Sequence, residues 1–258
     1  MHKKSIITIS IVSHLQGNLV KHLLDDLQKY CPDSIEVLLT VNSPENLPFE
    51  EADFRYPLRI VRNEAEKGFG ANHNTAFLMR KGSLFCIINP DVRLLQNPFG
   101  QLVRYMEDPS VGIVAPMVLD ENLSMNVSAR KFPTMSAVLR NFLGIRKPDY
   151  SFDTEPICVD WTAGMFMLFN QKAYEDVRGF DEGYYLYYED VDICARIWQY
   201  GYKVLYCPSV SIIHYARFQS HYSLRYFMWH ICSLTRYMLT RTCGTAAKKN
   251  PGGKNILF

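Results

Sequence analysis

The sequence predicts an α/β protein, a single Rossmann-like domain in which a mixed, mostly parallel sheet carries helices on both faces. Short apolar, β-branched runs alternate along the chain with segments whose apolar residues recur at helical spacing. Several of these runs end in polar residues, as strands do at the carboxyl edge of an open sheet. With 258 residues, 48% of them apolar, the chain can bury one large core and carry at most a small appendage.

The first half of the chain contains the regular strand and helix patterns. We expect strands at residues 6–12, 35–41, 58–61, 84–88 and 111–115, where apolar and β-branched residues are concentrated. Asn18 is expected to cap a first helix, because leucine and valine residues then recur on one face. Further helices are expected at residues 72–80, closed by Gly82, and after Asn97-Pro98.

The second half departs from this alternation. Residues 121–151 are expected to form an excursion over the site, and late strands are expected at residues 159–169, 203–207 and 210–214. A long helix is expected at about residues 220–241, with one apolar face that contains Leu224, Phe227, Met228, Ile231, Leu234 and Met238. Residues 246–255 are polar and glycine-rich, which is typical of a mobile tail. We therefore divide the chain into a main domain, residues 1–216, and a basic amphipathic helix with its tail, residues 217–258.

The charges are distributed unevenly along the chain. All 26 acidic residues lie at or before Asp192, whereas the last 66 residues hold nine Lys and Arg and no acid. The first 192 residues therefore carry 19 − 26 = −7, and the rest carries +9. This asymmetry predicts an acidic body and a tail that meets anions, such as a membrane surface, lipid phosphate or nucleic acid. The seven cysteines form no CxxC pair, which favours reduced thiols in the cytosol, and no apolar run is long enough to cross a bilayer.

The chain is organised around Tyr187-Tyr188-Glu189-Asp190-Val191-Asp192, where two tyrosines precede three carboxylates. Apolar residues then follow at helical spacing, so the carboxylates belong to the first turn of a helix, where the dipole favours anions. A capped helix start with solvated acids explains an isolated acidic cluster equally simply. The alternative is that Asp190 acts as a general base, with Glu189 helping to orient it.

Two further stretches have both a chemical and a structural interpretation. Asn89-Pro90-Asp91 ends a predicted strand, where a carboxylate can bind a hard divalent cation and through it a diphosphate, although the same tripeptide makes a good turn. The loop 67–74 contains Gly68, Gly70 and Asn74 and opens a helix, which suits phosphate binding or simply a tight connection.

His214 and Trp161 also have both a functional and a structural interpretation. His214 ends a predicted strand and could complete a metal site with Asp91, or be structural. Trp161, before Ala163-Gly164, could stack on a sugar ring or pack in the core. Polar residues at strand ends, namely Ser13, Asn42, Asn89 and Asp91, fit a ligand in the crevice at the carboxyl edge of the sheet.

The motifs in their order along the chain resemble glycosyltransferase family 2, whose members have the GT-A fold. They are Asn89-Pro90-Asp91, Asp160-Trp161-Thr162-Ala163-Gly164, Gly179-Phe180-Asp181-Glu182, Glu189-Asp190-Val191-Asp192 and His214-Tyr215. Four segments are similar to bacterial rhamnosyltransferases of O-antigen assembly: Arg130-Lys131-Phe132-Pro133, Val159-Asp160-Trp161, Tyr187-Tyr188-Glu189-Asp190 and Ile213-His214-Tyr215-Ala216. The resemblance extends from Ile6 to about Leu239.

The resemblance implies a role for each matching residue. Asp190 matches the catalytic base, and Asp91 with His214 matches the site for Mg²⁺ or Mn²⁺ on the donor diphosphate. Trp161 matches the position that shapes the acceptor pocket. The loop residues Gly68, Gly70 and Asn74 match the segment near the nucleotide.

Two positions depart from the family pattern. Asn89 replaces the first acid of the metal-binding motif. Val41 stands where many members have an acid that recognises the pyrimidine base, so base recognition here must use other groups, such as Asn42 or the backbone.

The resemblance also implies the reaction: an inverting transfer of L-rhamnose from dTDP-L-rhamnose to N-acetylglucosamine on an undecaprenyl diphosphate carrier. We then expect Arg130 and Lys131 to meet a diphosphate of the donor or carrier, and a peripheral location on the cytosolic face of a bacterial inner membrane. The C-terminal helix would turn Leu224, Phe227, Met228 and Ile231 inward and its cations toward an anionic leaflet. A sister enzyme with a galactofuranosyl or glucosyl donor is the nearest alternative. A nucleic-acid-binding protein is disfavoured by the acidic body.

Overall fold

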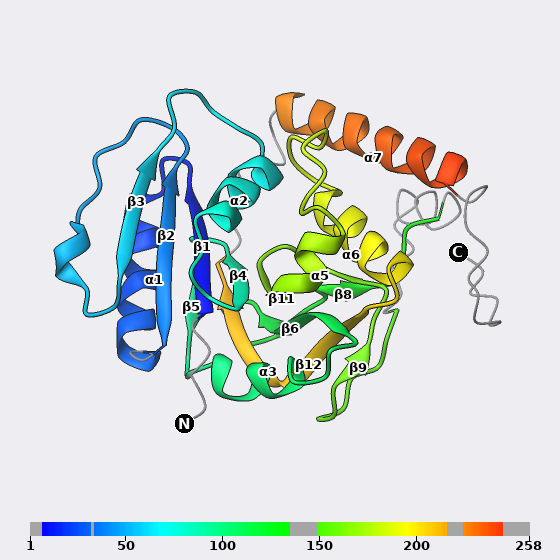
Figure 1. Cartoon of the computed structure of the whole chain (residues 1–258), viewed down its shortest axis with the longest axis horizontal. Helices are drawn as coiled ribbons and strands as arrows, with labels where there is room; N and C mark the ends of the chain where they lie inside the picture. Colours follow the sequence, from blue (N-terminus) through cyan, green and yellow to red (C-terminus); the bar gives the residue numbers. More distant parts are fainter. Residues whose placement is uncertain (1–6, 32–33, 135–148, 216–223, 245–258) are drawn as a thin grey trace.

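The computed structural model describes residues 7–31, 34–134, 149–215 and 224–244. A large mixed sheet forms its centre, and its strands follow the order β3-β2-β1-β4-β11-β6-β12-β5, with β7 beside β6 and β9 beside β12 (Figure 1). The strands are β1 (Ile7–Ser13), β2 (Ile35–Val41), β3 (Leu58–Arg62), β4 (Leu84–Ile88), β5 (Val92–Leu94), β6 (Val111–Leu119), β7 (Met125–Asn126), β9 (Ile157–Cys158), β11 (Phe166–Asn170) and β12 (Lys203–His214). A separate two-stranded sheet pairs β8 (Ala129–Arg130) with β10 (Trp161–Thr162).

The pairing directions confirm a mixed, mostly parallel sheet. Strands β3, β2, β1 and β4 are all parallel, and β12 runs parallel to β6. Strand β11 is antiparallel to both of its neighbours, β4 and β6. The chain direction reverses from β4 to β11 and again from β11 to β6, so β6 and β12 run parallel to β4. Strand β12 therefore ends at the same edge of the sheet as β1, β2 and β4. The polar residues that follow these four strands therefore lie along one edge.

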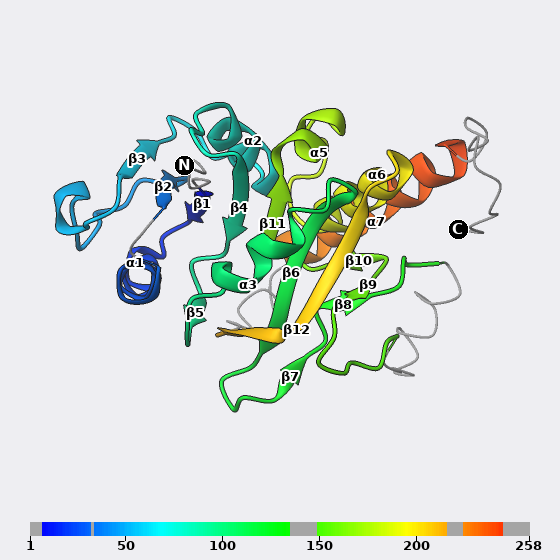
Figure 2. The same ribbon diagram turned by 60° about the horizontal axis from the view of Figure 1, so that its bottom comes forward.

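Helices cover both faces of the sheet, as predicted (Figure 2). They are α1 (Gly17–Tyr30), α2 (Phe69–Leu78), α3 (Phe99–Tyr105), α5 (Gln171–Asp176), α6 (Glu189–Gln199) and α7 (Leu224–Gly244), with a short 3₁₀ turn, η1 (Glu51–Asp53). Helices α1 and α3 share one buried apolar cluster with the sheet, and α2, α5 and α6 share the other. Alternate residues of β4 serve the two clusters, Cys86 and Ile88 facing one and Phe85 and Ile87 the other. Strands of this kind are buried on both faces and read as continuous apolar runs.

Three predictions of element ends are wrong. Asn18 does not cap α1, because the helix already begins at Gly17, whose N–H donates to Glu45 Oε2 over 2.9 Å. The predicted strands 203–207 and 210–214 form one strand, β12, whose register shifts between Cys207 and Ser211. Helix α2 ends at Leu78, so Gly82 does not close it. The central part of the predicted excursion, residues 135–148, and the tail, residues 245–258, lie outside the described residues.

The predicted orientation of the C-terminal helix is also wrong. Leu224, Phe227, Met228 and Ile231 are 75%, 62%, 57% and 44% exposed, so they face away from the domain. The opposite side of α7 packs on the segment before α6, which lies beneath α7 in Figure 1. The predicted start of this helix, residues 220–223, falls outside the described residues. Among the described residues, no helix combines the length and apolarity that crossing a bilayer requires.

Two glycines at the start of α2 permit a close approach of backbones. A Cβ at Gly68 would lie 2.8 Å from the Tyr185 carbonyl oxygen, and a Cβ at Gly70 would lie 2.6 Å from Cβ of Phe180. Both distances are too short for two packed atoms, so a side chain at either position would push α2 away from residues 180–185. The backbone hydrogen bond from Phe69 N–H to the Tyr185 carbonyl, 2.9 Å, depends on this approach.

We predict that Gly70→Ala lowers the free energy of unfolding by about 1–3 kcal/mol, because neither backbone nor Phe180 Cβ can move without repacking. Gly100→Ala is the matched control, since its new methyl group meets no atom within 4 Å in α3. That control should be neutral or should stabilise the helix by up to about 1 kcal/mol. Chemical denaturation of both variants measures the difference, and equal stabilities would contradict the packing role.

Candidate active site

The carboxyl edge of the sheet brings together Asp91 and His214. Asp91 follows β4 and His214 ends β12, and the Tyr215 N–H donates to the Asp91 carbonyl over 3.0 Å. His214 Nε2 lies 3.3 Å from Asp91 Oδ1, and the two side chains are 13% and 14% exposed. The predicted convergence of these two residues is therefore present. A cavity of about 420 Å³ opens beside Asp91 and is lined by Leu19, His22, Pro90, Asp91, Arg93, Glu121 and Tyr215.

The donor set of this pair fits a divalent metal that is shared with a substrate. A carboxylate oxygen and an imidazole nitrogen are both metal ligands, and among the described residues Asp91 Oδ1, the atom that faces His214 Nε2, is buried and makes no hydrogen bond. Within the same residues, no group of three His, Cys, Asp or Glu side chains could hold a metal ion alone. An ion at this pair needs further oxygen ligands from water or a phosphate, as Mg²⁺ commonly has.

The Asp190 carboxylate is fixed by backbone N–H groups at the start of α6. Gly164 N–H donates to Oδ2 over 3.1 Å, and Val191 N–H donates to Oδ1 over 2.8 Å. Gly164 precedes β11, and the neighbouring Met165 carbonyl accepts from Asn89 N–H over 2.9 Å. These contacts connect Asp190 to the end of β4, near Asp91 and His214. Burial raises the pKa of Asp190, while the backbone N–H groups and the charge of Arg130 lower it; the net direction is upward.

Glu189 lies next to Asp190 but is in a different environment. It is 5% exposed, and among the described residues its Oε2 has no hydrogen-bond partner. Burial, and then the negative charge of Asp190, raise the pKa of Glu189 well above its usual range. A pair of adjacent buried carboxyls keeps one proton more easily than two charges. Burial therefore disfavours the charged form of Glu189, while Asp190, which accepts two backbone N–H groups, is the better candidate for a base.

Two tyrosines in left-handed conformations lead into the helix. Tyr187 and Tyr188 have φ values of 70° and 64°, which cost bulky residues on the order of 1–3 kcal/mol each. Helix α7 holds this turn: the His230 ring lies 5.3 Å from the Tyr187 ring and 5.4 Å from the Tyr188 ring, between centroids. Ser233 Oγ also donates to the Leu186 carbonyl over 2.8 Å. The turn that aims Asp190 is thus maintained by contacts from another helix.

The predicted acceptor residues form one wall through the small β8–β10 sheet. Arg130 is the register partner of Trp161, and its guanidinium carbon lies 6.0 Å from the Trp161 ring centroid. Trp161 Nε1 donates to the Lys131 carbonyl over 2.9 Å, which fixes the indole. The charge of Arg130 acts on Asp190, so this cation belongs to the site. Lys131 instead places its amine 5.9 Å from the Tyr150 ring centroid, so the two predicted cations do not act as a pair.

Ser13 and Asn42 lie at the predicted edge, but protein groups occupy their side chains. Ser13 Oγ donates to Glu45 Oε1 over 2.5 Å. Asn42 Oδ1 accepts from Asn63 Nδ2 and Lys67 N–H over 2.8 and 2.9 Å, and Asn42 Nδ2 donates to the Lys67 carbonyl over 3.0 Å. Asn42 therefore shapes the loop after β3. Because protein groups already occupy its amide, that amide is not available for direct recognition of a base.

Asn74 and the two loop glycines have structural partners in the same region. Asn74 Oδ1 accepts from Tyr174 Oη over 2.8 Å and from Phe180 N–H over 2.9 Å. Its Nδ2 donates to the Phe180 carbonyl and to Glu182 Oε1 over 3.0 and 2.9 Å. All four hydrogen-bonding positions of this amide are occupied. Like Gly68 and Gly70, Asn74 attaches α2 to residues 180–185, and its predicted place near a nucleotide stays a prediction.

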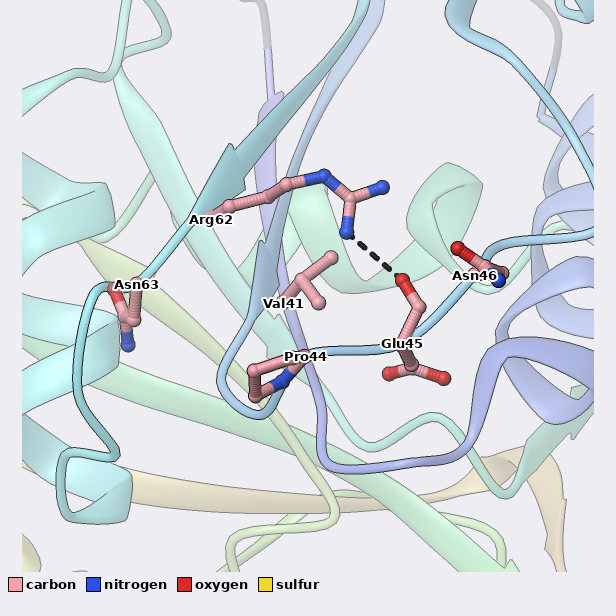
Figure 3. A pocket seen from close by; sticks show the side chains of 6 residues that line it. All are labelled: Val41, Pro44, Glu45, Asn46, Arg62 and Asn63. Atoms are coloured by element: carbon pink, nitrogen blue, oxygen red, sulfur yellow. Dashed lines mark hydrogen bonds between the residues drawn. The ribbon is translucent and has the colours of Figure 1, made fainter.

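A second cavity, of about 360 Å³, lies at the ends of β2 and β3 and contains residues that the sequence prediction missed (Figure 3). It is lined by Val41, Pro44, Glu45, Asn46, Arg62 and Asn63. Arg62 Nη1 donates to the Glu45 carbonyl over 3.0 Å, and Glu45 Oε2 accepts from Gly17 N–H, so the loop is bound to α1. The sequence signals for this cavity were its position after a strand and the family position of Val41, whereas Glu45 and Arg62 belong to no motif.

Comparison with known proteins gives a consistent result. Residues 84–229 match the family model described as glycosyl transferase family group 2. The chain is 30% identical to rhamnosyltransferase WbbL of Escherichia coli over 247 residues, which cover 90% of this chain and 92% of that protein. It is 26% identical to an N-acetylglucosaminyl-diphospho-decaprenol L-rhamnosyltransferase of Mycobacterium tuberculosis, over 81% of this chain and 76% of that protein.

A solved structure supports the fold. The crystal structure of GalNAc-T7 with UDP, GalNAc and Mn²⁺ superimposes with a TM-score of 0.66 at 17% identity. The match covers 85% of this chain, which spans 45% of the GalNAc-T7 chain. The fold is thus the GT-A fold that the motifs implied.

We predict that Glu189→Gln removes part of the pH dependence of stability. Because the pKa of Glu189 is raised in the folded chain, the unfolded chain binds fewer protons between the ordinary and the raised value, and the free energy of unfolding falls as pH increases through that range. Glutamine mimics the protonated acid and should abolish this fall. Unfolding curves across that range measure it, with Glu155→Gln at an exposed site as control. Identical slopes for wild type and Glu189→Gln would show that Glu189 is not held protonated.

Proposed function

The chain belongs to glycosyl transferase family group 2, and we propose that it is an inverting rhamnosyltransferase that uses dTDP-L-rhamnose. The proposed acceptor is N-acetylglucosamine linked through a diphosphate to undecaprenol, in the assembly of O-antigen or another surface polysaccharide. The enzyme then works at the cytosolic face of a bacterial inner membrane. One observation carries the proposal: a carboxylate with a raised pKa, held by the Gly164 and Val191 N–H groups, next to a wall formed by Trp161 and Arg130.

Asp190 is the proposed base. It removes the proton from an acceptor hydroxyl while the hydroxyl oxygen bonds to the anomeric carbon of the donor sugar. The bond between that carbon and the diphosphate oxygen breaks, and the nucleoside diphosphate leaves with its electron pair. Attack from the face opposite the leaving group inverts the configuration. A raised pKa makes Asp190 a stronger proton acceptor, and protonated Glu189 avoids a second negative charge beside it.

Asp91 and His214 are the proposed ligands of Mg²⁺ or Mn²⁺. A divalent ion at this pair supplies positive charge to the departing diphosphate. The chain itself provides only these two ligands, so we expect the metal and the nucleotide to bind together. Asn89 at the start of the motif can offer an amide oxygen in place of the usual carboxylate.

The remaining residues divide between donor and acceptor. For the donor, we propose that the nucleoside enters the cavity between β2 and β3, with Val41 in its wall, while Ser13, Asn42, Gly68, Gly70 and Asn74 shape its surroundings. For the acceptor, Trp161 offers an aromatic face to a sugar ring and Arg130 a cation to a phosphate. Lys131 is less suited, because its amine lies toward Tyr150.

The decisive experiment screens nucleotide sugars against a synthetic acceptor, N-acetylglucosamine linked by a diphosphate to a lipid. Transfer from dTDP-L-rhamnose with inversion supports the proposal. Transfer only from a galactofuranosyl or glucosyl donor would identify a sister enzyme of the same family. Epimeric sugars differ by one or two hydrogen bonds, so the donor has to be established by this measurement.

We predict that Asp190→Asn lowers the turnover rate by about 10²–10⁴-fold, because the amide cannot accept the proton. Binding of the donor, measured by calorimetry, should be preserved. Glu189→Gln is the matched control, since it changes the neighbouring carboxyl in the same way but mimics its protonated form. If Asp190→Asn retained the rate of Glu189→Gln, the assignment of the base would be wrong.

We also predict that transfer requires a divalent metal through Asp91 and His214. EDTA should abolish activity, and Mn²⁺ should restore it. Asp91→Ala and His214→Ala should each weaken the Mn²⁺-dependent binding of dTDP, because each removes one of two protein ligands. His22→Ala, which changes an exposed histidine in the cavity beside Asp91, should leave that binding unchanged. Full activity in chelator would exclude the metal site.

A further inference from the structure

Helix α7 exposes an apolar stripe on the side that faces away from the domain. The stripe consists of Leu224, Phe227, Met228 and Ile231, which are between 44% and 75% exposed. At 100° per residue these four side chains fall within one arc of the helix. Thr235 lies in the same arc and is exposed, but its hydroxyl is satisfied by the Ile231 carbonyl over 2.8 Å. An apolar helix face normally packs on a core, and this one does not.

The opposite side of α7 is already packed on the domain. Trp229 stacks on Tyr185 with ring centroids 4.6 Å apart, and Tyr237 is 2% exposed. The Arg236 guanidinium forms an ion pair with Asp181 at 2.8 Å. These contacts fix the rotation of the helix about its axis. The stripe therefore cannot turn inward without breaking an aromatic stack and a bidentate ion pair, and it remains available to a partner outside the domain.

The charges of the segment indicate what kind of partner covers the stripe. From residue 193 to residue 258 the sequence contains nine Lys and Arg and no acidic residue. Arg225, which is exposed, lies at the edge of the stripe with its guanidinium 4.6 Å from the Trp229 ring centroid. A second copy of this helix would bring like charges together. An anionic lipid leaflet instead offers acyl chains to the stripe and phosphates to Arg225 beside it.

We propose that the outward stripe of α7 is a membrane-binding surface that lies in the plane of an anionic bilayer, with its apolar side chains at the level of the acyl chains. The inference deepens the proposed function, on which its biological purpose rests. This mode of binding differs from docking through arginines alone, because the Arg236 guanidinium already forms an ion pair with Asp181. The inner side of α7 holds Tyr187 and Tyr188, so the bilayer-bound helix also supports the turn that precedes Asp190.

This arrangement places the catalytic turn close to the leaflet in which a lipid-linked acceptor resides. The diphosphate of such an acceptor stays near the bilayer surface, so an enzyme that acts on the attached sugar has to approach that surface. The stripe provides this approach by lying on the surface of the bilayer.

Flotation of the purified full-length protein with vesicles tests the proposal. Vesicles of phosphatidylethanolamine and phosphatidylglycerol supply the anionic surface, and phosphatidylcholine vesicles the neutral one. Phe227→Gln/Ile231→Gln should reduce the bound fraction on anionic vesicles by at least about tenfold, given the apolar area removed. Leu78→Gln/Leu123→Gln is the matched control, because Leu78 and Leu123 are 82% and 60% exposed elsewhere on the surface. That control should float like wild type, and circular dichroism should show that both variants are folded.

Two results would overturn the proposal. One is undiminished flotation of the Phe227→Gln/Ile231→Gln variant. The other is a wild-type dimer, seen by light scattering, that does not float and that this variant converts to monomer, because the stripe would then be a contact between copies. The experiment distinguishes this proposal from the proposed function. If flotation depends on the stripe but the enzyme uses none of the tested donors, the membrane-binding surface is supported and the proposed reaction is wrong. With a water-soluble, short-chain acceptor, the stripe variant should keep wild-type turnover.

Discussion

The arrangement of the site depends on how residues 179–188 are held, because this segment carries the turn into Asp190 and has no regular secondary structure of its own. Its backbone groups need partners from elsewhere, since unpaired buried peptide groups are costly. Helix α2 provides one set, with Phe69 N–H on the Tyr185 carbonyl and the Asn74 amide on both backbone groups of Phe180. Helix α7 provides the other, through Ser233 on the Leu186 carbonyl. The left-handed tyrosines before α6 persist because both sides of the segment are bound.

This constraint explains why several residues near the site have packing or hydrogen-bonding roles that cannot be recognised from a sequence motif. Gly68 and Gly70 lack side chains where α2 meets Tyr185 and Phe180, and Asn74 uses its whole amide there. A residue of a motif can therefore lie close to a ligand site although its residue type is required by packing. Asn42 is similar, since its amide oxygen collects N–H donors from the loop after β3. A residue whose polar atom makes no hydrogen bond within the protein, such as Asp91 at Oδ1, is the better indicator of a ligand site among the described residues.

Much of the fold was predictable, because the strands are apolar on both faces and the helices on one. The periodicity located β2 and β4 at their observed bounds and gave the parallel arrangement of the first strands. It could not locate β5 or α5, which are short elements of three and six residues whose order depends on neighbours in space. The start of α1 was missed for the same reason. Its first N–H is satisfied by Glu45, 28 residues away, and not by a side chain next to it in sequence.

The positions of Asp91, His214 and Asp190 were predictable, because each lies at the end of a strand or the start of a helix, and their chemical roles stay predictions. The site was not predictable where the outcome depends on which way a side chain turns. Arg130 belongs to β8 and lies against Trp161 of β10, whereas Lys131 follows the strand and its amine lies near the Tyr150 ring, so the two cations separate.

The C-terminal helix shows the same limit more strongly. Periodicity placed Leu224, Phe227, Met228 and Ile231 on one face, but it carries no information on whether that face meets the domain or the surroundings. The contacts of the other face decide this, and they are aromatic and ionic: Trp229 on Tyr185, and Arg236 on Asp181. Such contacts tolerate the partly wet boundary between a helix and a loop, which leaves the aliphatic side chains for an apolar environment that the domain itself does not supply.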